Sequence, residues 1–194
     1  MRHPSVQELY DYWNTQRGTR AAPYRSDIEP SAIRRALADT FILAFDTRHT
    51  FRIAGTRLCA AFNRELRGRP FVDLWADESV RRVQDLLSVI THESVGAVAG
   101  AHGSNAEGAS LDFELLLLPL LHRTPSDARV LGALAASEAP YWFGTTPLGG
   151  LTLSTIRYLG HGDPAAVPTR LKAAPPQAGG RMRRGLIVYD GGQA

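Results

Sequence analysis

The side chains in this sequence that could do covalent or metal chemistry are one cysteine and six histidines. A reactive cysteine needs a neighbouring group that stabilises its thiolate, and the segment around Cys59, Arg57-Leu-Cys-Ala-Ala, offers no such base. We therefore interpret Cys59 as a buried structural residue. The histidines show neither an i, i+4 pair nor a companion carboxylate pattern of the kind that binds a metal. They are His3, His49, His92, His102, His122 and His161. The sequence thus predicts no catalytic set, no metal site and no enzyme.

The residues that could instead form a binding site are large aromatic side chains that would surround small residues such as Ala54, Gly55, Ala97 and Ala99. Rings of this kind line the apolar walls of small-molecule pockets, and a few polar groups orient the ligand. The candidate ligand-binding residues are Phe51, Phe71, Trp75, Phe113 and Trp142, with Arg52 as the polar anchor. The alternative is that these rings fill an ordinary core. Gly100, Gly103 and Gly108 lack the lysine and serine of a phosphate-binding loop, so we interpret them as turn glycines.

The composition is that of one globular domain with extensions. The chain has 194 residues, of which 44% are hydrophobic and 21% charged. The 22 basic residues are spread along the chain and nearly balanced by 19 acidic ones, which argues against nucleic-acid binding. No apolar run approaches the ~20 residues that span a bilayer, and the N-terminus lacks the apolar centre of a signal peptide. We expect a cytoplasmic protein that does not enter a membrane.

The elements that position the aromatic candidates begin with an amphipathic helix near the N-terminus. Ser5-Val-Gln-Glu8 has the form of a capping box, with Ser5 as the N-cap. A second, shorter helix is expected over residues 30–37. The apolar face of the first helix has i, i+3, i+4, i+7 spacing, and it consists of Val6, Leu9, Tyr10 and Trp13. Two interpretations stay open: this face covers the chain's own sheet, or it binds a second copy or a partner.

The middle of the chain alternates between strands and helices in an order typical of an α+β domain. Residues 41–45 and 50–54 form a hairpin, with Phe51 and Ile53 on one face. A short helix follows Gly55, and a long one starts at Asp77. Three strands are expected over residues 94–102, 110–119 and 128–136, and residues 151–159 could add another. Grouped strands with short turns favour one antiparallel sheet with helices on one face.

Several motifs resemble those of the single-PAS-domain proteins of alphaproteobacteria. They are Tyr12-Trp13, Arg17, Arg20, Pro23, Arg25-Ser-Asp27, the segment Phe51-Arg-Ile-Ala-Gly-Thr56, and Leu116-Leu-Leu-Pro-Leu120. The resemblance implies a PAS-like five-stranded antiparallel sheet with helices on one face and an N-terminal helical extension. The expected domains are an extension over residues 1–39, the PAS-like domain over 40–160, a flexible linker over 161–184, and a tail with a short strand over 185–194. For Arg20, Arg25 and Asp27 we expect an internal Arg–Asp pair rather than a binding site.

The resemblance also implies a function in bacterial signal transduction. A PAS-like module would sense a small organic ligand, bind a partner signalling protein, or do both, and it would form a homodimer. The alternative is a ligand-free adaptor with a filled core. The cysteine motif of flavin-binding relatives is missing, and His92 lies at the end of the long helix rather than within it, so we expect neither flavin nor haem as cofactor.

Overall fold

The computed structural model describes residues 1–121, 129–160, 181–183 and 186–188. Its centre is a six-stranded antiparallel sheet in the order β2-β1-β5-β4-β3-β6. The strands are β1 (Thr40–Ala44), β2 (Phe51–Ala54), β3 (Gly96–Ser104), β4 (Ser110–Leu120), β5 (Arg129–Ala136) and β6 (Thr152–Leu159). The helices are α1 (Pro4–Arg17), α2 (Thr56–Ala61) and α3 (Asp77–Glu93), with 3-10 turns η1 (Arg25–Asp27), η2 (Pro30–Ile33) and η3 (Phe71–Leu74). The predicted α+β class is confirmed. The sheet has one strand more than the five expected, because β6 pairs with β3 along its length.

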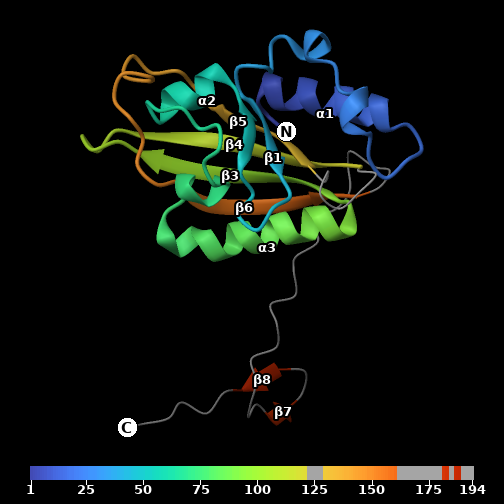
Figure 1. The fold of residues 1–194 in the computed structure, drawn as a ribbon. Helices are drawn as coiled ribbons and strands as arrows, with labels where there is room; N and C mark the ends of the chain where they lie inside the picture. Colours follow the sequence, from blue (N-terminus) through green and yellow to red (C-terminus); the bar gives the residue numbers. More distant parts are fainter. Residues whose placement is uncertain (122–128, 161–180, 184–185, 189–194) are drawn as a thin grey trace.

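Helices cover both faces of this sheet, and each face has its own hydrophobic core (Figure 1). Because strand side chains alternate between the two faces, Leu115 and Leu117 of β4 enter one core while Leu116 and Leu118 enter the other. We call the face toward α2, η3 and α3 the inner face, and the face toward α1 the outer face. The expectation of helices on one face therefore holds for the central helices alone.

The start of α1 differs from the predicted capping box. The N-cap is His3, whose Nδ1 accepts a hydrogen bond from the backbone N–H of Ser5 at 3.2 Å. Pro4 takes the first helical position, where a residue without an N–H costs nothing. Ser5 is consequently inside the helix and buried, so it is not the cap.

The apolar face of α1 packs against the outer face of the chain's own sheet. Its four side chains are at most 6% exposed, and they share a core with Leu116, Leu118 and Leu131. The indole Nε1 of Trp13 donates a hydrogen bond to the carbonyl oxygen of Pro119 at 2.9 Å. Of the two interpretations of Val6, Leu9, Tyr10 and Trp13, this packing corresponds to the covering of the chain's own sheet. Their use as a dimer or partner face stays a prediction.

Two local expectations also change. A bulge between Ile42 and Leu43 shifts the β1–β2 register, which leaves Ile53 48% exposed while Phe51 is buried. The second N-terminal helix is limited to the single turn η2, and Leu37 beyond it is 38% exposed.

Near the C-terminus, β7 (Arg181–Arg183) and β8 (Leu186–Val188) form a two-stranded antiparallel sheet. The short strand expected in the tail corresponds to β8. Residues 161–180 of the expected linker lie outside the described residues, as do 184–185 and 189–194.

Candidate functional site

The inner core is built around four aromatic rings that contact one another. Phe71 lies at their centre, with ring centroids 5.3 Å from Phe41, 5.6 Å from Phe51 and 5.7 Å from Trp75. Phe41 and Phe51 are themselves 5.6 Å apart in an edge-to-face arrangement. These separations are those of aromatic rings in favourable contact. Three of the predicted candidates, Phe51, Phe71 and Trp75, are therefore brought together, and they pack as a cluster.

Phe41 is the member of this cluster that the sequence analysis did not single out. It lies on β1 opposite Gly132 of β5, and a Cβ built on Gly132 would collide with its ring. The glycine thus makes room for the phenylalanine in the neighbouring strand. A glycine inside an otherwise apolar strand is the signal that could have indicated such a close approach.

The other candidates divide between the core and the surface. Phe113 and Trp142 are buried in the same inner core, 4% and 8% exposed. Arg52 is exposed on β2, and its charge acts on Asp46 in the adjoining turn. Because Arg52 is exposed while the rings are buried, the structure does not bring it to them.

One polar atom in the inner core has no hydrogen-bond partner among the described residues. It is Nε1 of Trp75, on a side chain that is 5% exposed. Buried indole N–H groups usually find an acceptor. A bound molecule with a hydrogen-bond acceptor next to Trp75 would therefore give this N–H the partner that it lacks in the packed core.

Within the described residues, the nucleophilic and metal-binding side chains do not assemble into a site. Cys59 is half-buried, and its Sγ lies 3.9 Å from Glu65 Oε1. No group of three histidine, cysteine or carboxylate side chains suited to a metal ion occurs in the part of the chain that the structure describes. His92 bonds back to Ser88 of its own helix. His122 and His161 lie outside the described residues.

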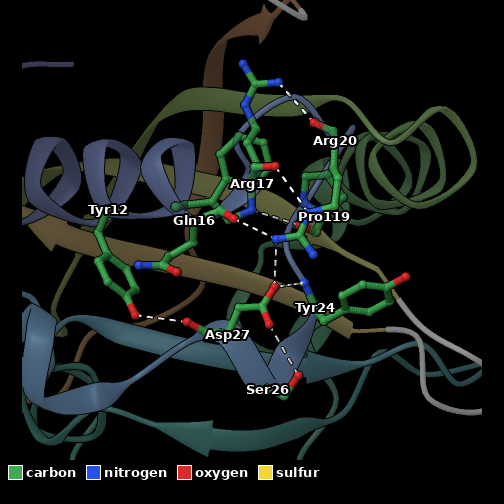
Figure 2. Close-up of polar contacts among 9 residues, drawn as sticks. Tyr12, Gln16, Arg17, Arg20, Tyr24, Ser26, Asp27 and Pro119 are labelled. Carbon is green, nitrogen blue, oxygen red and sulfur yellow. Dashed lines mark hydrogen bonds and ion pairs between the residues drawn. The ribbon is translucent and has the colours of Figure 1, made fainter.

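The polar residues in and after the last turns of α1 form a structural joint, shown in Figure 2. Arg20 Nη2 donates to the backbone oxygen of Gln16 at 2.7 Å and to Asp27 Oδ2 at 2.8 Å. The hydroxyl of Tyr12 donates to the carbonyl oxygen of Asp27 at 3.1 Å. The expected internal Arg–Asp pair is confirmed as Arg20–Asp27. These bonds fold the segment after α1 back onto the helix.

The electrostatics of this joint centre on Asp27. The backbone N–H of Tyr24, which donates to Asp27 Oδ2 at 3.0 Å, lowers the pKa of the carboxyl below 3.8. The hydrogen bond and charge of Arg20 add to this lowering, and partial desolvation opposes it. Asp27 therefore stays ionised and holds the turn η1 in place.

A groove of about 690 Å³ lies on the outer face of the sheet, beside the N-terminal end of α1. It is bordered by residues 1–4 and by parts of β3, β4, β5 and β6. Of the six predicted ligand-binding residues, Phe113 alone borders it. The sequence analysis did not indicate this groove, because its walls come from five segments that are distant in the chain.

A family model described as "PAS domain" matches residues 1–135 of the chain. The chain belongs to the PAS domain family. The match includes α1 and the polar joint as well as the first five strands of the sheet. The family is one of sensory and regulatory domains rather than enzymes. No curated protein matches the chain.

Solved PAS structures resemble the chain at low sequence identity. The PAS domain of an HTR-like protein from Haloarcula marismortui is 20% identical, with 55% of this chain and 90% of that chain covered and a TM-score of 0.39. The PAS domain of a protein from Colwellia psychrerythraea is 12% identical, with 56% and 97% covered and a TM-score of 0.41. The LOV protein of Rhodobacter sphaeroides is 14% identical, with 54% and 63% covered and a TM-score of 0.42. The assignment to the PAS family rests on the family match, since these TM-scores are below 0.5.

None of the helices that the structure describes is long and apolar enough to span a membrane.

Proposed function

We propose that this PAS domain is a regulatory module of bacterial signal transduction that acts by binding a partner signalling protein, with an inner core filled by its own side chains. The motifs that resemble those of single-PAS proteins of alphaproteobacteria support the assignment to bacterial signal transduction. The observation that carries the proposal is the ring cluster around Phe71, which is fully buried and contacts three other rings.

The argument depends on where a PAS ligand would lie. By the family resemblance, a small molecule would sit between the inner face of the sheet and the central helices. In this chain that space holds the ring of Phe71 in contact with those of Phe41, Phe51 and Trp75. Close-packed rings leave few voids larger than a water molecule. With no room for an internal ligand, the domain would exert its regulatory effect by binding a partner protein at its surface.

A homodimer remains part of this proposal. The second copy would contact a surface other than the apolar face of α1, because that face is buried within one chain.

A second candidate function is small-molecule sensing in the inner core, and one specific observation favours it. The N–H of Trp75 is buried without an acceptor in the described structure. A buried unsatisfied donor costs ~1–3 kcal/mol. A ligand with one acceptor atom beside Trp75 would remove that cost, after a shift of the surrounding rings.

Native mass spectrometry separates the two functions. For the adaptor, the native mass of the purified chain equals the denatured mass, or an integer multiple of it. For the sensor, the native mass exceeds it by the mass of a small organic molecule, and Trp75→Phe loses that excess. An excess mass in the wild type that Trp75→Phe loses would overturn the filled-core proposal.

A stability measurement gives an independent test. In a filled core, Phe113→Ala costs ~3–5 kcal/mol of unfolding free energy by denaturant titration. At the wall of a ligand cavity it costs clearly less. Tyr141→Ala is the matched control, because Tyr141 is 95% exposed and its truncation is expected to stay within ~0.5 kcal/mol.

A further inference from the structure

The groove on the outer face has the size of a small-molecule site. Its volume of about 690 Å³ falls within the ~300–1,000 Å³ typical of such sites. Its floor is the outer side of β3, β4 and β5, where Val98, Gly100 and Ala135 present small or apolar surface. Glu114 of β4 lies between Gly100 and Ala135 in this floor. It lies on the opposite side of the sheet from the ring cluster around Phe71, so it is separate from the inner core.

Three hydrogen-bond donors converge on one end of this groove. Gly100 has no side chain, and a Cβ built there would lie 2.5 Å from Ser154 Oγ and 3.0 Å from Thr155 Oγ1. The two hydroxyls of β6 therefore meet above the glycine. Arg157 borders the same groove from β6, opposite Val98 of β3. Among the described residues, neither hydroxyl nor the guanidinium has a hydrogen-bond or ion-pair partner.

The two carboxylates of the groove are already engaged. Glu114 accepts hydrogen bonds from the backbone N–H groups of Arg2, at 2.9 and 3.0 Å, and of His3, at 2.7 Å. Asp112 Oδ1 lies 2.8 Å from Nδ1 of His102. Both carboxylates thus have partners of their own, and Glu114 also lies 3.8 Å from the N-terminal ammonium group of Met1. Glu114 holds residues 2 and 3 in place as one wall. The unengaged charge at the Ser154–Arg157 end is positive.

We propose that this groove binds a small organic acid, whose carboxylate is held by Arg157 and the hydroxyls of Ser154 and Thr155, and whose apolar body lies over Val98 and Gly100 of β3. A guanidinium presents a planar fork that pairs with both oxygens of a carboxylate, and such charged pairs are stronger than neutral ones. The small and apolar surface of Val98 and Gly100 favours an acid with a flat or short hydrocarbon body over a bare inorganic anion. The inference goes beyond the proposed function, and its test does not depend on the contents of the inner core.

The test uses benzoate as the probe, with the full chain labelled with ¹⁵N. Benzoate is expected to shift the backbone amide signals of residues 98–101 and 154–157 in a saturable way. Arg157→Gln is expected to weaken benzoate binding at least about tenfold, the loss of one charged hydrogen-bonded pair. Gly100→Ala, which adds a methyl group between the floor and the hydroxyls, is expected to weaken binding while leaving the charge of the groove unchanged.

Arg81→Gln is the matched control, because it removes an arginine from the exposed side of α3, away from the groove. Its benzoate affinity is expected to equal that of the wild type. Inorganic phosphate, titrated in the same way, is expected to bind more weakly than benzoate. The proposal is overturned if benzoate does not saturate, if its shifts map outside the groove, if Arg157→Gln binds as tightly as Arg81→Gln, or if phosphate binds as tightly as benzoate. Circular dichroism of each variant establishes that it is folded.

Discussion

His49 at the end of the β1–β2 turn is half-buried, and its desolvation outweighs the stabilisation that Asp46 gives to its charged form. Its Nε2 has no hydrogen-bond partner among the described residues, and its ring lies 5.6 Å from that of Phe45. Desolvation lowers the pKa of His49 below 6.5, and the negative charge of Asp46 offsets part of that effect. The folded state thus binds a proton at this position less readily than the unfolded chain does.

This residue predicts a pH dependence of stability. Since the pKa of His49 is lower in the folded state, its contribution is fully favourable above pH 6.5 and is lost as pH falls from 6.5 through the folded-state pKa. The free energy of unfolding of the wild type is expected to fall in this window more steeply than that of His49→Gln. Urea titrations at a series of pH values from 7.5 to about 4.5 measure the difference. Parallel curves for the two proteins would show that His49 is not desolvated.

Gly55 lies where the neighbouring backbone leaves no room for a side chain. It precedes α2, and a Cβ built on it would lie 2.5 Å from the carbonyl oxygen of Leu37 and from the carbonyl carbon of Ala38. Both atoms are backbone and cannot rotate away. Gly55→Ala is therefore expected to cost ~1–3 kcal/mol, the range for overpacking a filled site.

Gly149→Ala is the control for this substitution. The nearest atom to a Cβ at that position is the carbonyl oxygen of Ser104 at 3.4 Å, an ordinary contact. Its effect on the free energy of unfolding, measured by urea titration, is expected to stay within ~0.5 kcal/mol. Equal losses in the two variants would mean that the close approach of residues 37–38 to Gly55 does not occur.

At the scale of elements, the joint between α1 and η1 depends on one carboxylate. Asp27 accepts from the backbone of Tyr24 and from the side chain of Arg20, which is itself 40% exposed. Water screens such a pair, so most of the stabilisation comes from the backbone bond at the start of η1. Asp27→Ala is expected to lower the free energy of unfolding by ~1 kcal/mol at pH 7.

The pH dependence of that loss identifies its origin. Because the pKa of Asp27 is lowered in the folded state, its stabilisation is present above pH 3.8 and is lost as pH falls through the folded-state value. The difference between wild type and Asp27→Ala should therefore shrink below pH 3.8. Ser26→Ala, which removes a long 3.4 Å bond to the same carboxylate, should change stability by less than ~0.5 kcal/mol. A difference between wild type and Asp27→Ala that is constant with pH would contradict the assigned role.

Helices and strands could be predicted from the sequence wherever the apolar side chains followed a clear helical or alternating spacing. The helix starting at Asp77, the hairpin and the strand over residues 110–119 were all indicated by spacing. Spacing could not indicate which face each helix covers, since β4 is buried on both sides from Leu115 to Leu118. The bulge at Ile42 and the cap at His3 were missed because each depends on tertiary context. The outer groove was missed because Gly100, Glu114 and Arg157 meet only in the folded sheet.

At the scale of the whole molecule, the sheet separates two cores that depend on different parts of the chain. The inner core is closed by segments between residues 55 and 90, which follow one another in sequence. The outer core is closed by α1 and the segment after it, which include Trp13, Ile28 and Ile33. The stability of the outer core therefore depends on an element at one end of the chain.

Removal of residues 1–27 tests whether α1 covers its own sheet. The deletion is expected to expose Leu116, Leu118 and Leu131, each at most 1% accessible in the full chain. Exposed contiguous apolar surface promotes association. The molar mass from light scattering is expected to rise with concentration in the deletion variant, and its thermal midpoint to fall.

The point variant Leu9→Ala keeps the full chain and tests the same packing. Leu9 is fully buried in α1, so its truncation is expected to cost ~2–5 kcal/mol. Gln7→Ala removes a neighbouring exposed side chain of the same helix and should cost less than ~0.5 kcal/mol. If α1 instead joins two copies, both the deletion and Leu9→Ala convert a dimer to a monomer that is otherwise stable. A variant of lower molar mass than the full chain, with an unchanged thermal midpoint, would thus overturn the covering role of α1.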